Sequence, residues 1–485
     1  MIPQSAASGS VRSWAALTMA AAILLGGCSL TPPYQRPAYQ LPRTLGELYP
    51  QQAAKQQDSA ESLSAQEARF LRQLSPNRDL SPLVIQALAH NADFRLTTLQ
   101  VAQAHAQYGI EQSQRWPQLG FDVQDNRQQF HDPALQARYG EHVAVASVGI
   151  TDFDFDFFGR LAALSDAARE HYLASSYGQQ AARGALIAEA LRAYALERSA
   201  AEALAQWQAV DIDSAELLRI AVHQQQVGLI SDDALNDQHH QADQAHANAL
   251  QVSADHNAAI RALQLVAGYT ATPAEGSLEE LLASDGSQDQ WRSSDSKVLL
   301  QRPDIQQAEA ELRAANADIG AARAAFFPSI SLSTSLGTAS NSLRGLFDAG
   351  TQLWTFVPQL TLPIFDGGRN QANLSLAKLR KQACIVDYEK AIQSAFREVA
   401  DALDAHTPLL EREQRETAQA EREQERTRRM TARTAEGWED RSALLVERIQ
   451  AARAQLDAIQ AGQNLVLNRI ALFQAFYGVQ PTSSI

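Results

Sequence analysis

Histidine and aspartate recur between residues 223 and 256 and make the densest group of potential metal ligands in this 485-residue chain. His239, Asp243 and His246 are separated by four and then three positions, so they would share one face of a helix. Imidazole and carboxylate groups placed in this way suit a transition metal. A long helix also carries polar residues wherever it meets solvent, and we favour that second interpretation. The sequence predicts no cofactor and leaves these three residues as a candidate metal site.

The stretch DFDFDFFG, which begins at Asp152, carries aspartate at every other residue at its start. A calcium loop needs glycine at its sixth position and a bidentate glutamate at its twelfth. Phe157 and Ala163 occupy those positions, so the calcium interpretation fails. Alternate residues of a strand face opposite sides, so the pattern predicts a strand with an apolar and a polar face. The apolar face takes Phe153, Phe155 and Phe157, and the polar face takes Asp152, Asp154 and Asp156.

No sequence motif for catalysis is found. The chain has no glycine-rich phosphate loop, no Gly-x-Ser-x-Gly and no HExxH. Its two distant cysteines, Cys28 and Cys384, give no disulfide framework, and the helical pattern around Cys384 favours packing over nucleophilic attack. A net charge of −14 without a basic stripe argues against a nucleic-acid groove. We therefore expect neither an enzyme nor a nucleic-acid-binding protein.

The first residues have the pattern of a secretion signal. Arg12 precedes the apolar run WAALTMAAAILL, which is too short to span a bilayer as a helix. The following LGGC, residues 25–28, resembles a bacterial lipobox, which implies that residues 1–27 are removed and that Cys28 is lipidated. Ser29 is compatible with sorting to the outer membrane. Beyond the signal no window of about 18 apolar residues occurs, so we expect no transmembrane helix.

The chain repeats one plan twice. Residues of the first half recur in the same order in the second half, at offsets between 209 and 211 positions. The matched pairs are Asp93 and Asp304, Gly109 and Gly320, Trp116 and Phe327, Gly159-Arg160 and Gly368-Arg369, Gly228 and Gly437, and Gly268 and Gly478. An ordered series at a nearly constant offset indicates an internal duplication.

Each copy is expected to contain a helix, two strands, a long helix and a return helix. Residues 160–227 and 369–436 are rich in helix formers, and each would be about 100 Å long as one helix. Gly228 and Gly437 mark the turns at the helix tips, and Pro408 is expected to kink or divide the second long helix. The predicted segments are a lipoprotein signal peptide (1–27), a Pro/Gln-rich linker (28–80), a first repeat (81–270), a connector (271–300), a second repeat (301–478) and a C-terminal tail (479–485).

Period-two alternation is sustained in only four segments, near residues 118–124, 142–158, 329–336 and 352–365. In the last segment one face would carry Trp354, Phe356, Leu360, Leu362 and Ile364. Four strands cannot close a barrel in a membrane, because an open edge leaves backbone groups unpaired in hydrocarbon and membrane barrels need about eight strands or more. The sheet is therefore either soluble or shared among subunits, and three copies would supply twelve strands.

With these features the chain resembles the TolC/OprM-like outer-membrane factor family, in its NodT-type efflux lipoprotein branch. The likeness is carried by LGGCSL, TPPYQRP, FDFFGR, QRPDIQQAEAELRAANADIGAARAAFFPSISL and LPIFDGGR. It implies an α+β membrane protein that forms a homotrimer, with a twelve-stranded outer-membrane β-barrel continued by a periplasmic α-helical barrel. It also implies a passive exit duct for drugs, organic acids, solvents or metals, which an inner-membrane pump and a periplasmic adaptor deliver. A duct for type I protein secretion and a soluble periplasmic coiled-coil scaffold are the alternatives.

The resemblance also assigns particular residues to positions in the channel. The phenylalanines of the alternating stretch would meet outer-membrane lipid, and its aspartates would face the lumen. The junctions between barrel and helices would be Gly159, Arg160, Gly368 and Arg369. Relatives place an aspartate of an acidic aperture ring nine residues after the turn glycine, where this chain has Val446, so Glu447 or Asp237 would replace it. The charged run 411–433 is a solvent-facing helix, a docking surface for the adaptor, or both.

Overall fold

The structure is a computed structural model that describes residues 30–37, 62–139, 141–268, 276–282 and 295–479. The chain divides into two units, Met1–Gln51 and Gln52–Ile485. In the first unit the described residues form no helix or strand. The predicted signal peptide and Cys28 lie outside the described residues.

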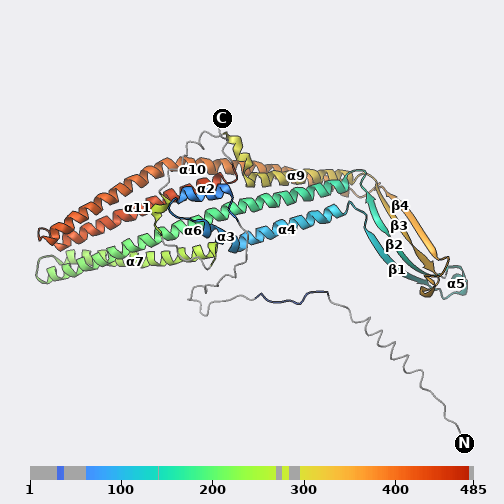
Figure 1. Ribbon diagram of the computed structural model, residues 1–485, viewed down its shortest axis with the longest axis horizontal. Helices are drawn as coiled ribbons and strands as arrows, with labels where there is room; N and C mark the ends of the chain where they lie inside the picture. The colour runs from blue at the N-terminus through green and yellow to red at the C-terminus, as the bar shows by residue number, and fades with distance from the viewer. Residues whose placement is uncertain (1–29, 38–61, 140, 269–275, 283–294, 480–485) are drawn as a thin grey trace, which may run out of the picture. The chain divides into compact units, whose positions relative to one another are not determined.

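The helices and strands of the described residues lie in the second unit (Figure 1). Each half of the chain runs from a helix through two strands into a long helix and then a return helix. In chain order the elements are α2 (Ala65–Leu74), α3 (Ser81–His90), α4 (Ala92–Ser113), β1 (Leu119–Gln128), α5 (Pro133–Tyr139), β2 (Glu141–Phe155), α6 (Arg160–Gln226), α7 (Asp232–Ala267), η1 (Leu278–Leu281), η2 (Ser296–Gln301), α9 (Pro303–Ala324), β3 (Ser329–Ser340), η3 (Leu343–Gly345), β4 (Gln352–Thr361), α10 (Arg369–Ala435) and α11 (Arg441–Ala475).

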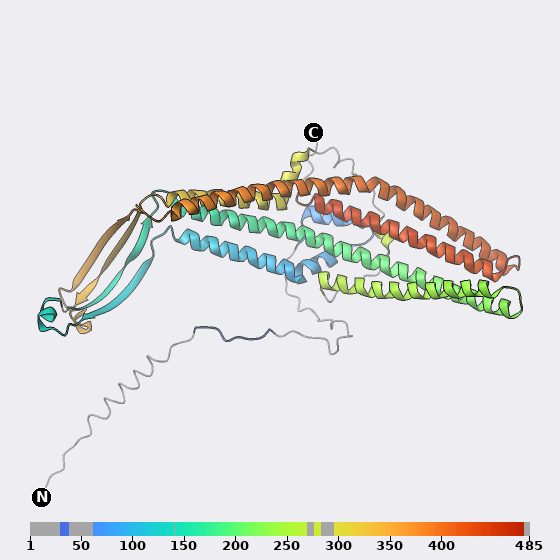
Figure 2. The ribbon, with the colours of Figure 1, turned by 180° about the vertical axis from the view of Figure 1, so that it is seen from behind.

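The two long helices, α6 and α10, have 67 residues each, which makes each about 100 Å long. Each packs against its own return helix, α7 or α11, and α6 also packs against α11 (Figure 2). α10 runs through Pro408 without a break, so the alternative in which proline divides the helix is wrong. Strong helix formers on both sides of the proline keep the helix continuous. None of the helices described has a stretch that is both long and apolar enough to cross a bilayer.

The main hydrophobic core lies where α6 and α11 meet α2, α3 and η1. Ile187 and Leu191 of α6 and Val466 of α11 are at most 1% exposed. Leu278 and Leu281, which belong to the predicted connector, are buried in the same cluster. Part of the connector therefore packs against α6 and α11.

The prediction of a linker over residues 28–80 is wrong for its last part, which contains α2. This helix begins with a capping box, in which Ser64 Oγ accepts from the N–H of Glu67 and the Glu67 carboxylate accepts from the N–H of Ser64. Leu71 and Leu74 are 2% and 3% exposed and join the core. Apolar residues at helical spacing thus outweigh the Pro/Gln composition that suggested a linker.

Glu67 is a buried carboxylate that joins three parts of the chain that are distant in sequence. Its Oε1 accepts hydrogen bonds from Arg183 Nε at 2.8 Å and from the Tyr477 hydroxyl at 2.7 Å. Burial alone would raise the pKa of Glu67, but the bonds from Arg183, Ser64 and Tyr477 outweigh it and lower the pKa. Burial, together with the charge of Glu67, raises the pKa of Tyr477. One ionised carboxylate therefore fixes α2 to α6 and to the segment after α11.

Candidate functional site

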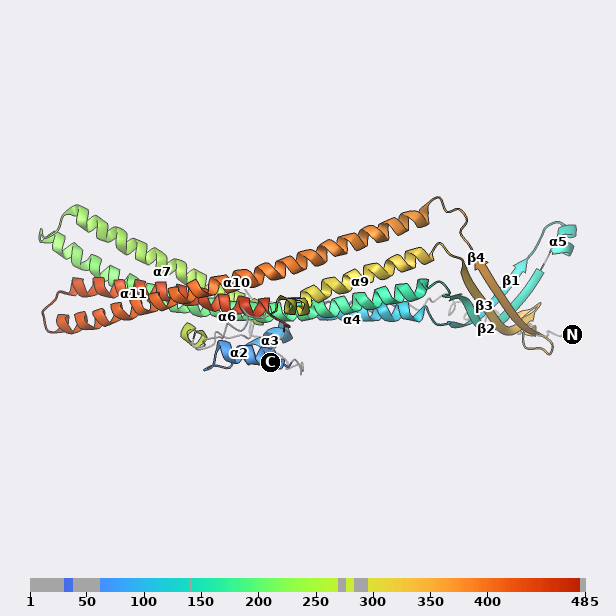
Figure 3. The ribbon, with the colours of Figure 1, turned by 90° about the horizontal axis from the view of Figure 1, so that it is seen from above.

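The four strands form one antiparallel sheet in the order β1-β2-β3-β4. Among the described residues, β1 and β4 each have a neighbouring strand on one side only, so this sheet has two open edges. Figure 3 shows that α4, α6, α9 and α10 all meet the sheet at the same end. An unpaired edge presents N–H and C=O groups that are ready to pair with another chain.

The register divides the side chains of the sheet into an apolar and a polar set, because directly opposite residues point to the same face. The apolar face consists of Leu119, Phe121, Val123, Val148, Ile150, Phe153, Phe155, Ile330, Leu332, Leu336, Trp354, Phe356 and Leu360. The other face carries mostly polar residues, among them Asp122, Gln124, Ser147, Asp154, Ser331, Ser333, Ser335, Thr355 and Gln359. Phe121 and Trp354 are 71% and 73% exposed. A contiguous apolar surface of this kind marks an interaction with another molecule or a membrane.

The apolar face has the dimensions of a lipid-facing band. Along β4 it extends from Trp354 to Leu360, which is about 20 Å at about 3.3 Å per residue. Three of the four transitions between helix and strand add an exposed aromatic residue: Trp116, Phe157 and Phe365. Outer-membrane strands carry an apolar band about 25 Å tall that is flanked by aromatic residues. The sheet matches this pattern on one of its faces.

A β-bulge in β2 decides which phenylalanines join the apolar face. Between Ile150 and Phe153, two residues of β2 lie opposite the single residue Ser333 of β3. Asp152 in the bulge has a φ of +49°, which residues other than glycine rarely adopt, and its N–H donates to Ser333 Oγ at 3.0 Å. The extra residue shifts the alternation by one, so Phe153 and Phe155 lie on the same face as Ile150. In an uninterrupted strand they would face the opposite side.

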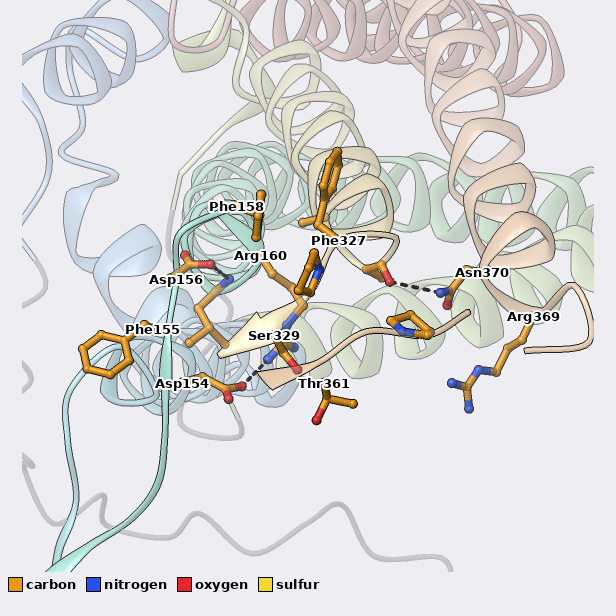
Figure 4. Close-up of a pocket in the computed structure, with 15 residues that line it drawn as sticks. Asp154, Phe155, Asp156, Phe158, Arg160, Phe327, Ser329, Thr361, Arg369 and Asn370 are labelled. Atoms are coloured by element: carbon orange, nitrogen blue, oxygen red, sulfur yellow. Dashed lines mark hydrogen bonds and ion pairs between the residues drawn. The ribbon is translucent and has the colours of Figure 1, made fainter. Parts of the chain in front are cut away.

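The three aspartates of this stretch do not share the face of a regular strand, so that prediction is wrong. Asp152 lies in the bulge, and Asp154 forms an ion pair with Arg160 at 2.9 Å (Figure 4). Asp156 follows the end of the strand and accepts hydrogen bonds from the N–H of Leu161 at 3.1 Å and from the next N–H at 2.6 Å. The free N–H groups at the start of a helix attract a carboxylate, which the alternating pattern could not reveal.

The predicted junction residues begin the two long helices. Gly159 and Gly368 are the residues that precede α6 and α10, with φ values of +74° and +87°. Arg160 and Arg369 are the first helical residues. Because only glycine adopts such positive φ values at no steric cost, these positions let the chain turn from a strand into a helix.

At the second junction, as at the first, an aspartate carboxylate accepts backbone N–H groups at the start of the long helix. Asp366 accepts hydrogen bonds from the N–H groups of Gly368 at 2.9 Å and Asn370 at 2.8 Å. These bonds, that of Asn370 first, lower the pKa of Asp366. Asp366 therefore holds the start of α10 as Asp156 holds the start of α6, although the second copy lacks the run of three aspartates.

The turns at the far ends of the long helices contain the predicted glycines. Gly228 and Gly437 have φ values of +77° and +80°, a region that favours glycine. The neighbouring Val227, Leu229 and Trp438 are 58%, 73% and 73% exposed. Each tip thus combines a left-handed turn with exposed apolar side chains.

Ion pairs join the two helix hairpins near these tips. Asp213 of α6 is 3.0 Å from Arg448 of α11, and Glu216 of α6 is 3.1 Å from Arg441. Bonds from Arg219 and then Arg441 lower the pKa of Glu216 to about 2, whereas burial raises the pKa of Asp213. No sequence pattern indicates these pairs, since Glu216 and Arg441 are 225 positions apart.

The two carboxylates suggested for the aperture have different surroundings. Asp237 lies exposed on α7. The side chain of Glu447 is 12% exposed, with Oε1 at 2.8 Å from Arg426 Nη2 and Oε2 buried. Within the chain Glu447 is therefore paired with α10, while Asp237 is open to solvent.

The three residues of the candidate metal site are not brought together. His239 and Asp243 are exposed, and His246 Nδ1 instead lies 3.2 Å from Asp211 Oδ2 of α6. In the described ranges of the chain, no group of three or more His, Cys, Asp or Glu residues is arranged to hold a metal. A solvated helix face accounts for the pattern.

Cys384 lies on α10 and is partly exposed. Burial, together with the charges of Glu311 and Asp387, raises the pKa of its thiol. A nucleophilic cysteine needs a lowered pKa, so its surroundings oppose such a role.

The chain is similar in sequence and structure to outer-membrane channels. The family model described as outer membrane efflux protein matches residues 83–269 and 296–476. Outer membrane protein OprJ of Pseudomonas aeruginosa is 37% identical to this chain over 407 residues, which cover 80% of each chain. Cation efflux system protein CusC of Escherichia coli is 36% identical over 401 residues, which cover 80% of this chain and 82% of that one. The crystal structure of the Neisseria gonorrhoeae MtrE outer membrane channel is 31% identical, with a TM-score of 0.71, and the match covers 93% of this chain and 98% of that one. The chain therefore belongs to the outer membrane efflux protein family.

Proposed function

We propose that three copies of this chain form the outer-membrane duct of a tripartite efflux system, through which small molecules or ions leave the cell. The observation that carries the proposal is the sheet, with a broad exposed apolar face, a polar face and two open edges. A membrane covers the apolar face, and the polar face lines a water-filled lumen. The family to which the chain belongs supports this function.

Closure of the sheet requires neighbouring copies. β1 of one copy pairs with β4 of the next, so that three copies of four strands make a twelve-stranded barrel. A closed barrel leaves no edge, which is the condition for a β-structure in hydrocarbon. The homotrimer satisfies both open edges, and its twelve strands exceed the eight that a membrane barrel needs.

The helices also have surfaces that a neighbouring copy would cover. On α4, Leu96, Leu99 and Ile110 are 57%, 58% and 55% exposed, and their spacing places them on one helix face. On α10, Leu379 and Val386 are each 61% exposed and are seven positions apart. Two different apolar edges on one chain suit a head-to-tail ring. In the trimer, the ring of helices continues the barrel as a periplasmic tunnel.

The duct is passive and is not an enzyme. An inner-membrane pump supplies the energy, and a periplasmic adaptor connects pump and duct. The adaptor docks at the tips, where Val227, Leu229 and Trp438 offer exposed apolar contacts next to the charged run 411–433. Opening rearranges the helices near the two tip glycines when the pump complex engages.

Two further residues take part in the proposed assembly. Cys28, once lipidated, anchors each chain to the outer membrane, since buried acyl chains add membrane affinity. Asp237 is the first candidate for the acidic aperture, because Glu447 is already paired with Arg426. Asp237→Asn should change cation block or ion preference of single channels, and unchanged conductance and ion preference would remove it from the aperture.

The transported substrate is a small molecule or an ion. CusC is named a cation efflux protein, and a toluene efflux pump outer membrane protein of Pseudomonas putida is 36% identical to this chain over 394 residues. Such relatives favour small-molecule efflux over the alternative of protein secretion. The exposed apolar sheet face disfavours a soluble periplasmic scaffold.

Cell fractionation and gel migration test the proposal. The protein should fractionate with the outer membrane and migrate as a heat-modifiable trimer. Its recovery in the inner membrane or in the soluble periplasm would refute the duct.

In-cell crosslinking tests the partners. A photo-crosslinker in place of Trp438 at a tip should capture the adaptor. The same crosslinker in place of Phe347, which is 86% exposed between β3 and β4, should not. Capture of a small-molecule pump distinguishes efflux from secretion, in which a peptide exporter would be captured.

A further inference from the structure

A hollow of about 320 Å³ lies where strands and long helices meet (Figure 4). It is lined by the last residues of β2 and β4, the first residue of β3 and the first turns of α6 and α10. Its volume is at the lower end of the range for small-molecule pockets. The two structural repeats therefore form this hollow together.

The hollow belongs to the polar side of the sheet. Ser329 lies directly opposite Thr361, and Asp154 lies opposite Ser331 on the same face. Asp154, Ser329 and Thr361 all line the hollow. If the polar face lines the lumen, as the proposed function requires, the hollow opens into the wall of the duct.

One cation at the hollow makes no ion pair or hydrogen bond through its guanidinium with a described residue, although its charge helps to lower the pKa of Asp366. Arg160 is neutralised by Asp154 at 2.9 Å. Arg369 also lines the hollow and is exposed, and no described residue accepts a hydrogen bond or an ion pair from its guanidinium. Asp366 is near, but its two oxygens accept the N–H groups of Gly368 and Asn370. A guanidinium with free donors suits a carboxylate, which it binds through two parallel hydrogen bonds.

The other side of the hollow is aromatic. Phe158 and Phe327 are stacked with their ring centroids 4.8 Å apart and their planes at 14°. They are 46% and 53% exposed, so a ligand can reach them. A planar apolar body gains from contact with such rings, beyond the area that it buries. An anionic group and an aromatic body on one small molecule would satisfy both sides.

We propose that this hollow is a binding site for small aromatic carboxylates in the wall of the duct. Arg369 binds the carboxylate, Phe158 and Phe327 contact the ring, and Ser329 and Thr361 line the same hollow. The site binds organic acids where the barrel continues into the tunnel. Its position inside a duct rests on the proposed function, whereas its binding chemistry does not.

Binding of 1-naphthoate to the purified trimer in detergent, measured by titration calorimetry, tests the site. Arg369→Gln should weaken naphthoate binding about tenfold, because one charge-assisted hydrogen-bonded contact is lost. The matched control is Arg344→Gln, which removes another exposed arginine, in η3 between β3 and β4, and should leave binding unchanged. Neutral 1-naphthalenemethanol should bind weakly and equally to all three proteins.

Three results would overturn the inference: no naphthoate binding, equal losses in both arginine variants, or equal affinity for the acid and the alcohol. Fractionation of the same proteins separates this inference from the proposed function. An outer-membrane trimer that binds no naphthoate contradicts only the site. A protein that binds naphthoate but does not reach the outer membrane contradicts only the duct.

Discussion

Replacement of two adjacent residues of β4 by arginine tests the assignment of the sheet faces. Phe356 and Val357 are 58% and 55% exposed, and they face opposite sides of the sheet. Phe356 lies near the middle of the apolar band, where an arginine costs about 2–4 kcal/mol in an outer-membrane barrel. This cost lowers the folding equilibrium of each chain about 30- to 700-fold. Val357→Arg points to water and should cost less than about 0.5 kcal/mol.

The assay compares the two variants under identical expression. Phe356→Arg should lose the heat-modifiable trimer band and should unfold at a lower urea concentration in phospholipid vesicles. Val357→Arg should resemble the wild type in both measurements. Equal behaviour of the two variants would refute the assignment of the faces, because a soluble sheet would tolerate either arginine.

Deletion of Asp152 removes the bulge but keeps Ile150 and Phe153 on one face, so the heat-modifiable trimer band should survive. Deletion of Ser147 from the regular part of β2 moves the side chains on one side of the deletion to the opposite face, so it should abolish the band. Glu67→Gln leaves a mostly buried arginine without its anion and should lower the free energy of unfolding by about 3 kcal/mol, as measured by denaturant titration. Because the pKa of Glu67 is lowered on folding, the difference in free energy of unfolding between wild type and Glu67→Gln should be full above the ordinary pKa of 4.5 and should shrink as pH falls through the lowered value. A difference that does not change with pH would contradict the role of the ionised carboxylate. The hydrogen bond that His171 donates to the Glu311 carboxylate raises the pKa of His171, so the pair should stabilise the fold below pH 6.5 and lose its effect as pH rises through the raised value. The melting temperatures of wild type and His171→Gln should therefore converge at high pH, and a gap independent of pH would count against the pair.

Features that depend on neighbouring residues could be predicted from the sequence. The helix expected over 160–227 is α6, Arg160–Gln226, because alanine, leucine, glutamate and glutamine favour helix at every step. Gly228 and Gly437 adopt the positive φ that their place between two helical runs indicated. The four alternating segments are the four strands, although β4 ends at Thr361, before Leu362 and Ile364. In these cases a local preference and the final fold agree.

The sequence by itself thus determined the long helices, the strands, the duplication and the class of protein. Only the tertiary structure decided which side chains work together. The bulge at Asp152 exists because β2 must pair with β3, a strand almost 200 positions later, and Ser333 accepts the N–H that the bulge turns outward. Glu447, suggested for the aperture, is paired with Arg426 because α11 folds back on α10. Among the described residues the guanidinium of Arg369 forms no ion pair, and it lines the same hollow as two stacked aromatic rings because two halves of the chain converge there. Periodicity records the preferences of each segment, whereas pairing register and ion-pair partners depend on distances between segments, and these are set when the elements pack.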